Sequence, residues 1–255
     1  MDTTSVPIAE RIAEVRAEIE RACFRAGRAP DSVTLVAVSK THPPEDIATA
    51  VRAGVRQFGE NRVEEALPKM AAVAGLVNEP VTWHMIGHVQ SRKARHVTAG
   101  FALLHSLDSV RLAERLSRAL AERAGALDVL LEVNVSGEET KHGWDAYSWQ
   151  ARAAARRVLW DDVARILTLP GVAVRGLMTM APIVDDPEEA RPVFAALRAL
   201  RDALANDFPA AAWDHLSMGM TDDYPVAIEE GATLVRIGRA VFGPRVTTRP
   251  GMDPP

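Results

Sequence analysis

The feature that most constrains this chain is a regular alternation of short apolar runs with longer helical segments. The first run, residues 33–39, is almost wholly apolar and rich in β-branched residues, which is typical of a strand buried on both faces of a parallel sheet. Eight such runs occur, each followed by a helix or a helix start. The predicted strands are residues 33–39, 55–58, 82–86, 102–106, 128–135, 173–178, 213–216 and 233–237. The predicted helices between them are residues 45–53, 62–73, 90–98, 109–124, 145–168, 187–205 and 223–230.

This alternation predicts an α/β fold with a parallel sheet, and eight units in 255 residues match a single (β/α)8 TIM barrel. A doubly wound open sheet needs the same local pattern and stays the alternative, although no G-x-G-x-x-G follows the first strand. Apolar spacing of three and four over residues 8–23 predicts an extra N-terminal helix. We expect residues 1–243 to form one domain and the proline-rich residues 244–255 to form a flexible tail.

Composition excludes several classes of function. The net charge of −4 gives no basic field for nucleic acid or an anionic membrane. A single cysteine, Cys23, leaves no disulfide framework and no metal-binding cysteine pair. Neither a secretory signal nor an apolar span of membrane length is present. We therefore expect a cytoplasmic protein with no nucleic-acid or membrane partner.

Lysine is scarce, because only four of the 30 cationic residues are lysines: Lys40, Lys69, Lys93 and Lys141. Unlike arginine, a desolvated lysine can become a neutral nucleophile. Lys40 directly follows the first predicted strand, and in a barrel the functional face lies at such strand exits. Its position allows Schiff-base chemistry with a carbonyl, although a surface lysine or a simple anion ligand would fit the same place.

Two glycine-containing turns follow the last two predicted strands. One carries Ser217 and Gly219, and the other carries Gly238. Barrels commonly bind phosphate in these two loops, although glycine also occurs in such turns for steric reasons alone. A lysine nucleophile and a phosphate cradle across one barrel mouth indicate pyridoxal 5′-phosphate (PLP), with Arg236 placed to reach the pyridine nitrogen.

Other polar residues give weaker signals. Asn61 follows the second strand and could contact a cofactor ring oxygen or cap the next helix. His84 and His88 lack a third ligand and the spacing of a helical metal site, so we expect no metal. Asn134 and Lys141 lie in the loop region after the fifth strand, where they could line the mouth or be ordinary loop polarity.

Five segments closely resemble the pyridoxal phosphate homeostasis proteins, the YggS/PROSC family. They are LVAVSKT (35–41), QFGEN (57–61), WHMIGHVQS (83–91), LSMGMTDD (216–223) and VRIGRAVFG (235–243). The resemblance implies a barrel like the N-terminal domain of alanine racemase, with PLP held covalently on Lys40. It also implies that the cofactor site contains Asn61, Ser217, Gly219, Arg236 and Gly238, with Ser217 and the two glycine loops on the phosphate.

The chain departs from the family pattern in three places. Arg239 stands where the family usually has Thr or Ser, so we expect a charged contact to phosphate in place of a hydroxyl. Arg92 stands where the pattern usually has Asn, and residues 144–162 form a longer connection than usual.

Two functions of different class fit a PLP barrel. A PLP-dependent amino-acid racemase needs a second base opposite the lysine, typically a tyrosine from an additional domain. We see no segment for such a domain after the eighth strand, and neither Tyr147 nor Tyr224 is an obvious second base. The resemblance instead implies a non-catalytic protein that buffers PLP and delivers it to apo-enzymes, and we expect it to be a monomer. We therefore assign no catalytic residues and expect a PLP homeostasis protein.

Overall fold

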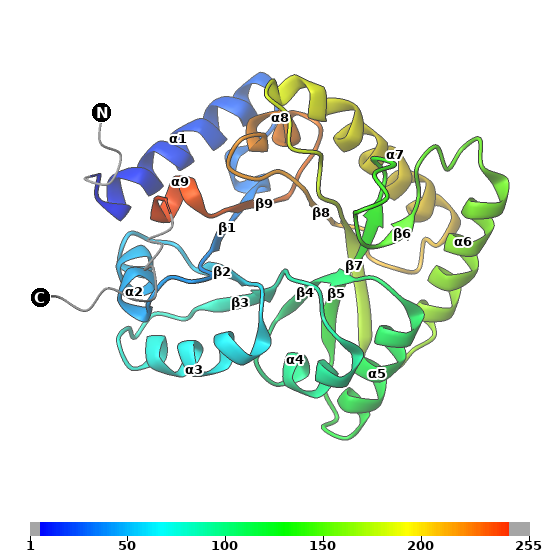
Figure 1. Cartoon of the computed structure of the whole chain (residues 1–255), viewed down its shortest axis with the longest axis horizontal. Helices are drawn as coiled ribbons and strands as arrows, with labels where there is room; N and C mark the ends of the chain where they lie inside the picture. Colours follow the sequence, from blue (N-terminus) through cyan, green and yellow to red (C-terminus); the bar gives the residue numbers. More distant parts are fainter. Residues whose placement is uncertain (1–5, 245–255) are drawn as a thin grey trace, which may run out of the picture.

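The computed structural model describes residues 6–244, and the predicted barrel is confirmed (Figure 1). Eight parallel strands follow one another in the order β1-β2-β3-β4-β5-β7-β8-β9, and pairing of β9 with β1 closes the ring. A short ninth strand, β6, pairs with the end of β5 outside this ring. The strands are β1 (Thr34–Val38), β2 (Gln57–Glu60), β3 (Thr82–Met85), β4 (Leu103–Leu107), β5 (Leu127–Asn134), β6 (Trp144–Asp145), β7 (Val172–Met178), β8 (His215–Ser217) and β9 (Leu234–Ile237).

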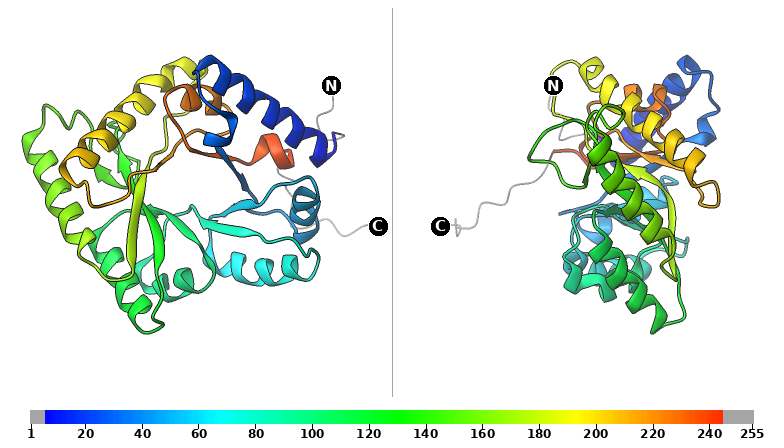
Figure 2. Two further views of the ribbon diagram at one scale, coloured as in Figure 1. Left: turned by 180° about the vertical axis from the view of Figure 1, so that it is seen from behind. Right: turned by 90° about the vertical axis from the view of Figure 1, so that its right-hand side faces the viewer.

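Helices form an outer layer around the strands (Figures 1 and 2). They are α1 (Ile8–Arg25), α2 (Pro44–Arg52), α3 (Val63–Ala74), α4 (Ala94–Gly100), α5 (Val110–Ala121), α6 (Ala153–Leu167), α7 (Arg191–Asp207), α8 (Tyr224–Glu229) and α9 (Arg239–Phe242). The predicted N-terminal helix is α1. It packs against α2, α8 and α9, and therefore covers the side of the barrel where the first and last strands meet.

Three predicted helices differ from the structure. The predicted helices over 90–98 and 187–205 each begin as a 3-10 turn, Ser91–Lys93 and Pro187–Ala190, followed by α4 and α7. The predicted helix over 145–168 begins only at Ala153. The Asp145 carboxylate accepts hydrogen bonds from the Tyr147 backbone N–H and from Arg152, and such local bonds compete with helix formation.

Alternation along the strands separates two cores. Outward-facing residues such as Ala37 and Phe58 join the large apolar core beneath the helices. A much smaller apolar cluster, which includes Val36 and Leu130, fills the barrel interior. Buried polar side chains occupy the rest of the barrel interior. A binding or catalytic site can therefore lie inside the barrel.

Two further sequence predictions concern membrane-spanning helices and the C-terminal tail. No helix within residues 6–244 is long and apolar enough to cross a membrane. The predicted tail lies, except for Pro244, outside the described residues.

Candidate functional site

Lys40 stands at the exit of β1, in the turn that follows the strand, and is partly buried. Val36 points into the barrel, so the alternation gives Val38 the same inward side, and Lys40 follows two residues later in the turn. Thr41, the next residue, has a φ of +68°, which is uncommon for a threonine. The turn that carries Lys40 is therefore held in a costly backbone conformation, a feature that clusters at functional sites.

A buried ion pair supports this turn from the helix side. The Lys69 ammonium, on α3, donates to the Glu60 carboxylate at 2.8 Å and to the Ser39 carbonyl at 2.9 Å. The Ser39 hydroxyl donates to the same carboxylate oxygen at 2.7 Å. Ser39 and Glu60 have no exposed surface. Sequence reasoning gave Lys69 no role, because nothing in the spacing shows that α3 brings it under the residue preceding Lys40.

Asn61, at the exit of β2, has an unsatisfied buried atom. Its side-chain oxygen is inaccessible to solvent and has no hydrogen-bond partner among residues 6–244. Gly87 lies against its backbone, since a Cβ at Gly87 would come 2.2 Å from the Asn61 carbonyl oxygen. The loop after β3 therefore closes over Asn61, and its buried side-chain oxygen lacks the partner that such a polar atom normally has.

The two glycine turns lie side by side at the exits of β8 and β9. Gly219 has a φ of +92°, and its carbonyl accepts the Arg236 backbone N–H at 3.0 Å. Gly238 directly precedes α9, and a Cβ there would lie 3.4 Å from the Val38 carbonyl oxygen. The turn that carries Gly238 therefore lies beside the end of β1, and this end of the strand is close to Lys40 in sequence. The first backbone N–H groups of α9 have no partners within the helix, as at any helix start.

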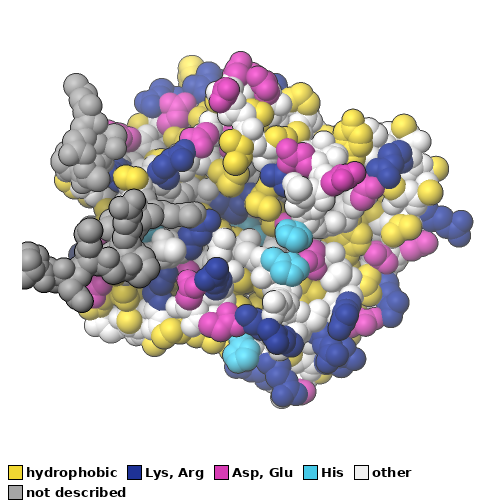
Figure 3. All heavy atoms as spheres, viewed as in Figure 1, with side chains coloured by type: hydrophobic (Ala, Val, Ile, Leu, Met, Phe, Trp, Pro, Cys, Tyr) yellow, Lys and Arg dark blue, Asp and Glu magenta, His cyan; other side chains and the backbone are white. Residues whose placement is uncertain are grey.

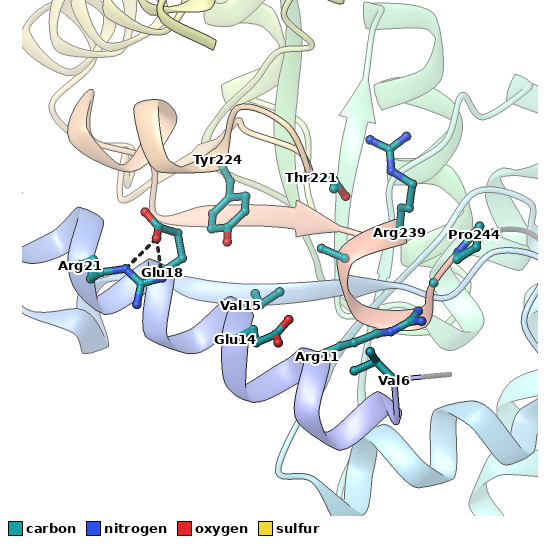
Figure 4. A pocket seen from close by; sticks show the side chains of 12 residues that line it. Val6, Arg11, Glu14, Val15, Glu18, Arg21, Thr221, Tyr224, Arg239 and Pro244 are labelled. Carbon is teal, nitrogen blue, oxygen red and sulfur yellow. Dashed lines mark hydrogen bonds and ion pairs between the residues drawn. The ribbon is translucent and has the colours of Figure 1, made fainter. Parts of the chain in front are cut away.

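Arg239 is the first residue of α9, and its side chain is mostly exposed. Its guanidinium donates to both carboxylate oxygens of Asp222, the longer contact being 2.7 Å. Figure 4 shows this side chain on the rim of an outer pocket of about 610 Å³, extending away from α1. Arg239 is thus near the second glycine turn but already paired with an acid.

Arg236, on β9, is a buried cation in the barrel interior and is 6% exposed. Its guanidinium donates to the Ser217 hydroxyl and, at 2.9 Å, to the Thr179 carbonyl. Burial lowers the pKa of Arg236 to about 10, so the side chain remains charged at neutral pH. The structure therefore brings the predicted residues Ser217 and Arg236 into direct contact.

Glu132, on β5, is a second buried charge-bearing group, and sequence reasoning missed it. It is 4% exposed, and one of its carboxylate oxygens has no hydrogen-bond partner among the described residues. Burial, with a smaller contribution from Asp108 and against the pull of Arg236, raises its pKa to about 7. The only sequence signal was a glutamate at an inward position of a strand that otherwise reads as apolar.

The two histidines considered as metal ligands lie in different places. His84 is buried in the barrel, whereas His88 is half exposed, lies 2.9 Å from the Asp108 carboxylate and stacks on His142. Histidine side chains lie together near the middle of the face seen in Figure 3. Over residues 6–244 no cluster of three or more potential ligands could hold a metal ion.

The loop after β5 is organised mainly by its own bonds. The Asn134 side-chain oxygen accepts the backbone N–H groups of Ser136 and Gly137, and its amide donates to the Glu138 carbonyl at 2.8 Å. Lys141 reaches across to the Ala181 carbonyl at 3.3 Å, which joins this loop to the one after β7. Asn134 is thus engaged within its loop, and Lys141 links two loops that follow barrel strands.

The fold and the site define a barrel of the alanine racemase N-terminal type. The family model named alanine racemase, N-terminal domain, matches residues 13–246. An alanine racemase from Clostridium difficile has the same fold, with a TM-score of 0.66 at 9% identity, covering 95% of this chain and 58% of that one.

Relatives with higher sequence identity show which family of this barrel class the chain belongs to. Pyridoxal phosphate homeostasis proteins from Aquifex aeolicus and Pseudomonas aeruginosa are 43% and 42% identical, covering 92% and 93% of this chain and 97% and 96% of those proteins. The structure of PipY from Synechococcus elongatus with PLP bound is 38% identical with a TM-score of 0.78, covering 92% of this chain and all of that one. The chain belongs to the pyridoxal phosphate homeostasis protein family.

Proposed function

We propose that this protein binds PLP through a Schiff base with Lys40, buffers this reactive aldehyde and delivers it to apo-enzymes. PLP needs an amine for its aldehyde and an anion site for its phosphate. The observation that carries the proposal is the pairing of β1 with β9, by which the Gly238 turn lies beside the end of the strand that precedes Lys40. We further propose that the protein acts as a cytoplasmic monomer.

The residues at the ends of these strands fit the chemistry of PLP. PLP supplies an electrophilic aldehyde, and we expect the amine of Lys40, in the turn after β1, to meet it. We propose that the Asn61 side-chain amide contacts the ring oxygen of the cofactor; the missing partner of its side-chain oxygen supports a polar ligand at this position. Arg236 supplies a cation for the pyridine nitrogen. We propose that the phosphate site consists of the turn from Ser217 to Gly219 together with Gly238 and Arg239. The Ser217 hydroxyl stays bonded to Arg236 at the inner edge of this site, and Arg239 joins after exchange of its contact with Asp222.

The covalent step is tested by absorption spectroscopy of the purified protein with added PLP. We expect a visible band from the Schiff base that persists after removal of free cofactor and is lost in Lys40→Ala. Lys93→Ala, in the 3-10 turn before α4 where Lys93 pairs with Glu64, is the matched control and should retain the band. Failure of the wild-type protein to take up PLP would overturn the proposal.

The alternative is a PLP-dependent racemase, and the two tyrosines give it no support. Tyr224 lines the outer pocket beside α1, and burial raises its pKa to about 12. The Tyr147 ring packs over Gly137, where a Cβ would come 2.9 Å from it. Neither tyrosine side chain is therefore in a position that supports a second base opposite Lys40.

The two functions are separated by α-proton exchange of amino acids in deuterated water. A carrier should show no exchange above the rate of free PLP and should reactivate an apo-enzyme when loaded with PLP. Rapid exchange that disappears in Lys40→Ala would establish the racemase-type activity instead.

A further inference from the structure

Five polar side chains form a continuous hydrogen-bonded path across the barrel interior. Arg236 on β9 donates to the Ser217 hydroxyl on β8, which lies 2.8 Å from His105 Nδ1 on β4. His105 Nε2 lies 2.8 Å from His84 Nδ1 on β3. His84 Nε2 in turn lies 2.7 Å from the Gln57 side-chain oxygen on β2. We call these five side chains, Gln57, His84, His105, Ser217 and Arg236, the histidine relay.

The donor end fixes the direction of every hydrogen bond in the relay. Arginine can only donate, so the Ser217 oxygen accepts from Arg236. The hydroxyl hydrogen of Ser217, a residue with no exposed surface, then has a single acceptor among residues 6–244, which is His105 Nδ1. Reversing the path would leave this hydroxyl without an acceptor, and an unsatisfied buried donor is costly.

The direction determines the tautomer of both imidazoles. Because His105 Nδ1 accepts, a neutral His105 carries its hydrogen on Nε2 and donates to His84 Nδ1. His84 then also carries its hydrogen on Nε2 and donates to the carbonyl oxygen of Gln57. Each imidazole therefore uses both ring nitrogens, one as acceptor and one as donor.

The charges around the relay favour neutral imidazoles. Burial, and to a smaller extent repulsion from His215, lower the pKa of His84 to about 4. Burial, then His84, Arg236 and His215, lower the pKa of His105 well below its usual range. His84 and His105 are 4% and 0% exposed, so solvent cannot replace the relay's hydrogen bonds.

We propose that His105 and His84 are positioning residues for Arg236, fixing the orientation of its guanidinium through Ser217. The hydrogen-bond partners of this cation among residues 6–244 are neutral, namely the Ser217 hydroxyl and the Thr179 carbonyl. Glu132 and Asp223 attract it electrostatically, but no carboxylate is hydrogen-bonded to it among the described residues. The guanidinium is thus held without being neutralised, and its charge remains available to a ligand in the barrel mouth.

The tautomers are tested on the ligand-free protein by nitrogen NMR of labelled histidine. Of the seven histidines, His84 and His105 should remain neutral Nε2–H tautomers from about pH 5 to pH 8. Signals are assigned by loss in His84→Gln and His105→Asn. Titration of either residue in this range, or an Nδ1–H tautomer at either, would overturn the relay.

The positioning role is tested by following the Arg236 guanidinium in the same samples. A fixed guanidinium gives separate, slowly exchanging Nη–H signals, which we assign by their loss in Arg236→Lys. These signals should collapse in His105→Phe, return at least in part in His105→Asn, and persist in the exposed control His96→Phe. Persistence in His105→Phe would show that the relay does not hold Arg236.

The consequence for ligand binding rests on the proposed function. We expect His105→Phe to weaken PLP binding about tenfold, the effect of one lost buried hydrogen bond. The same substitution should have no further effect in an Arg236→Lys background, because the relay acts through Arg236. Additive effects of the two substitutions on PLP binding would show that His105 does not act through Arg236. Failure of the wild type to bind PLP would overturn the proposed function and leave the two NMR tests standing.

Discussion

At the scale of single residues, Glu132 shows how one buried carboxyl group ties the stability of the barrel to pH. Its pKa is raised from 4.5 to about 7, so the folded state retains a proton that the unfolded state loses near pH 4.5. Stability contributed by the neutral acid is complete below pH 4.5 and falls as pH rises toward 7, because the folded protein binds more protons over that interval.

We therefore predict that Glu132→Gln, which keeps the shape without the charge, raises the free energy of unfolding at pH 8 by up to about 3 kcal/mol. At pH 4 the two proteins should be similar in stability. Urea unfolding at both pH values measures the difference, with the exposed Glu139→Gln as control. A variant no more stable than the wild type at pH 8 would show that Glu132 is not a desolvated acid.

At the scale of elements, the turn after β8 depends on a glycine for two separate reasons. Gly219 has a φ of +92°, and a Cβ there would come 2.7 Å from the Ala227 side chain and 3.0 Å from the Tyr224 backbone. Gly27, after α1, has a φ of +64° but nothing within 4 Å of a Cβ. Both positions are strained for alanine, and only Gly219 is also crowded.

We predict that Gly27→Ala costs about 1 kcal/mol of folding free energy, the conformational term alone. Gly219→Ala should cost about 2–4 kcal/mol, since α8 must also move. Urea unfolding compares the two variants directly. Equal losses of folding free energy in the two variants would mean that α8 moves away from the added methyl group at no cost in stability.

The elements were largely predictable from sequence, because buried parallel strands and amphipathic helices leave periodic patterns. The strand at 33–39 and the helix at 8–23 appear as β1 and α1 with small shifts at their ends. The predicted helix extends too far over residues 145–152 because they lead into the alanine- and arginine-rich segment 151–157, which favours helix, while the side-chain bonds of Asp145 that prevent helix there depend on the folded loop.

The candidate site was predictable only where position in the barrel determines it. Asn61 and Gly238 follow strands directly and Lys40 follows β1 after one further residue, so the barrel topology alone assigns them to the mouth. The Lys69–Glu60 pair and the contact between His105 and Ser217 join residues 9 and 112 positions apart through side chains. Periodicity says which side of a strand a residue faces, but not which partner it meets across the interior.

At the scale of the whole molecule, the ring of strands is closed where the chain begins and ends. β1 pairs with β9, and α1 packs on α8 and α9 over this closure. Since α9 is only four residues long, α1 supplies most of the apolar cover there. Ile12, which is 1% exposed, lies on the covering face. The N-terminal helix should therefore unfold together with the barrel rather than ahead of it.

We predict that Ile12→Ala lowers the free energy of unfolding by about 2–5 kcal/mol through the cavity it leaves. Unfolding should remain a single transition with an unchanged dependence on urea, because a change that alters stability alone moves only the midpoint. Glu20→Ala, on the exposed side of α1, should change stability by less than about 0.5 kcal/mol. Circular dichroism and tryptophan fluorescence should give coincident transitions in all three proteins. A separate early loss of helix in Ile12→Ala would mean that α1 is an independent unit and that the barrel closes without it.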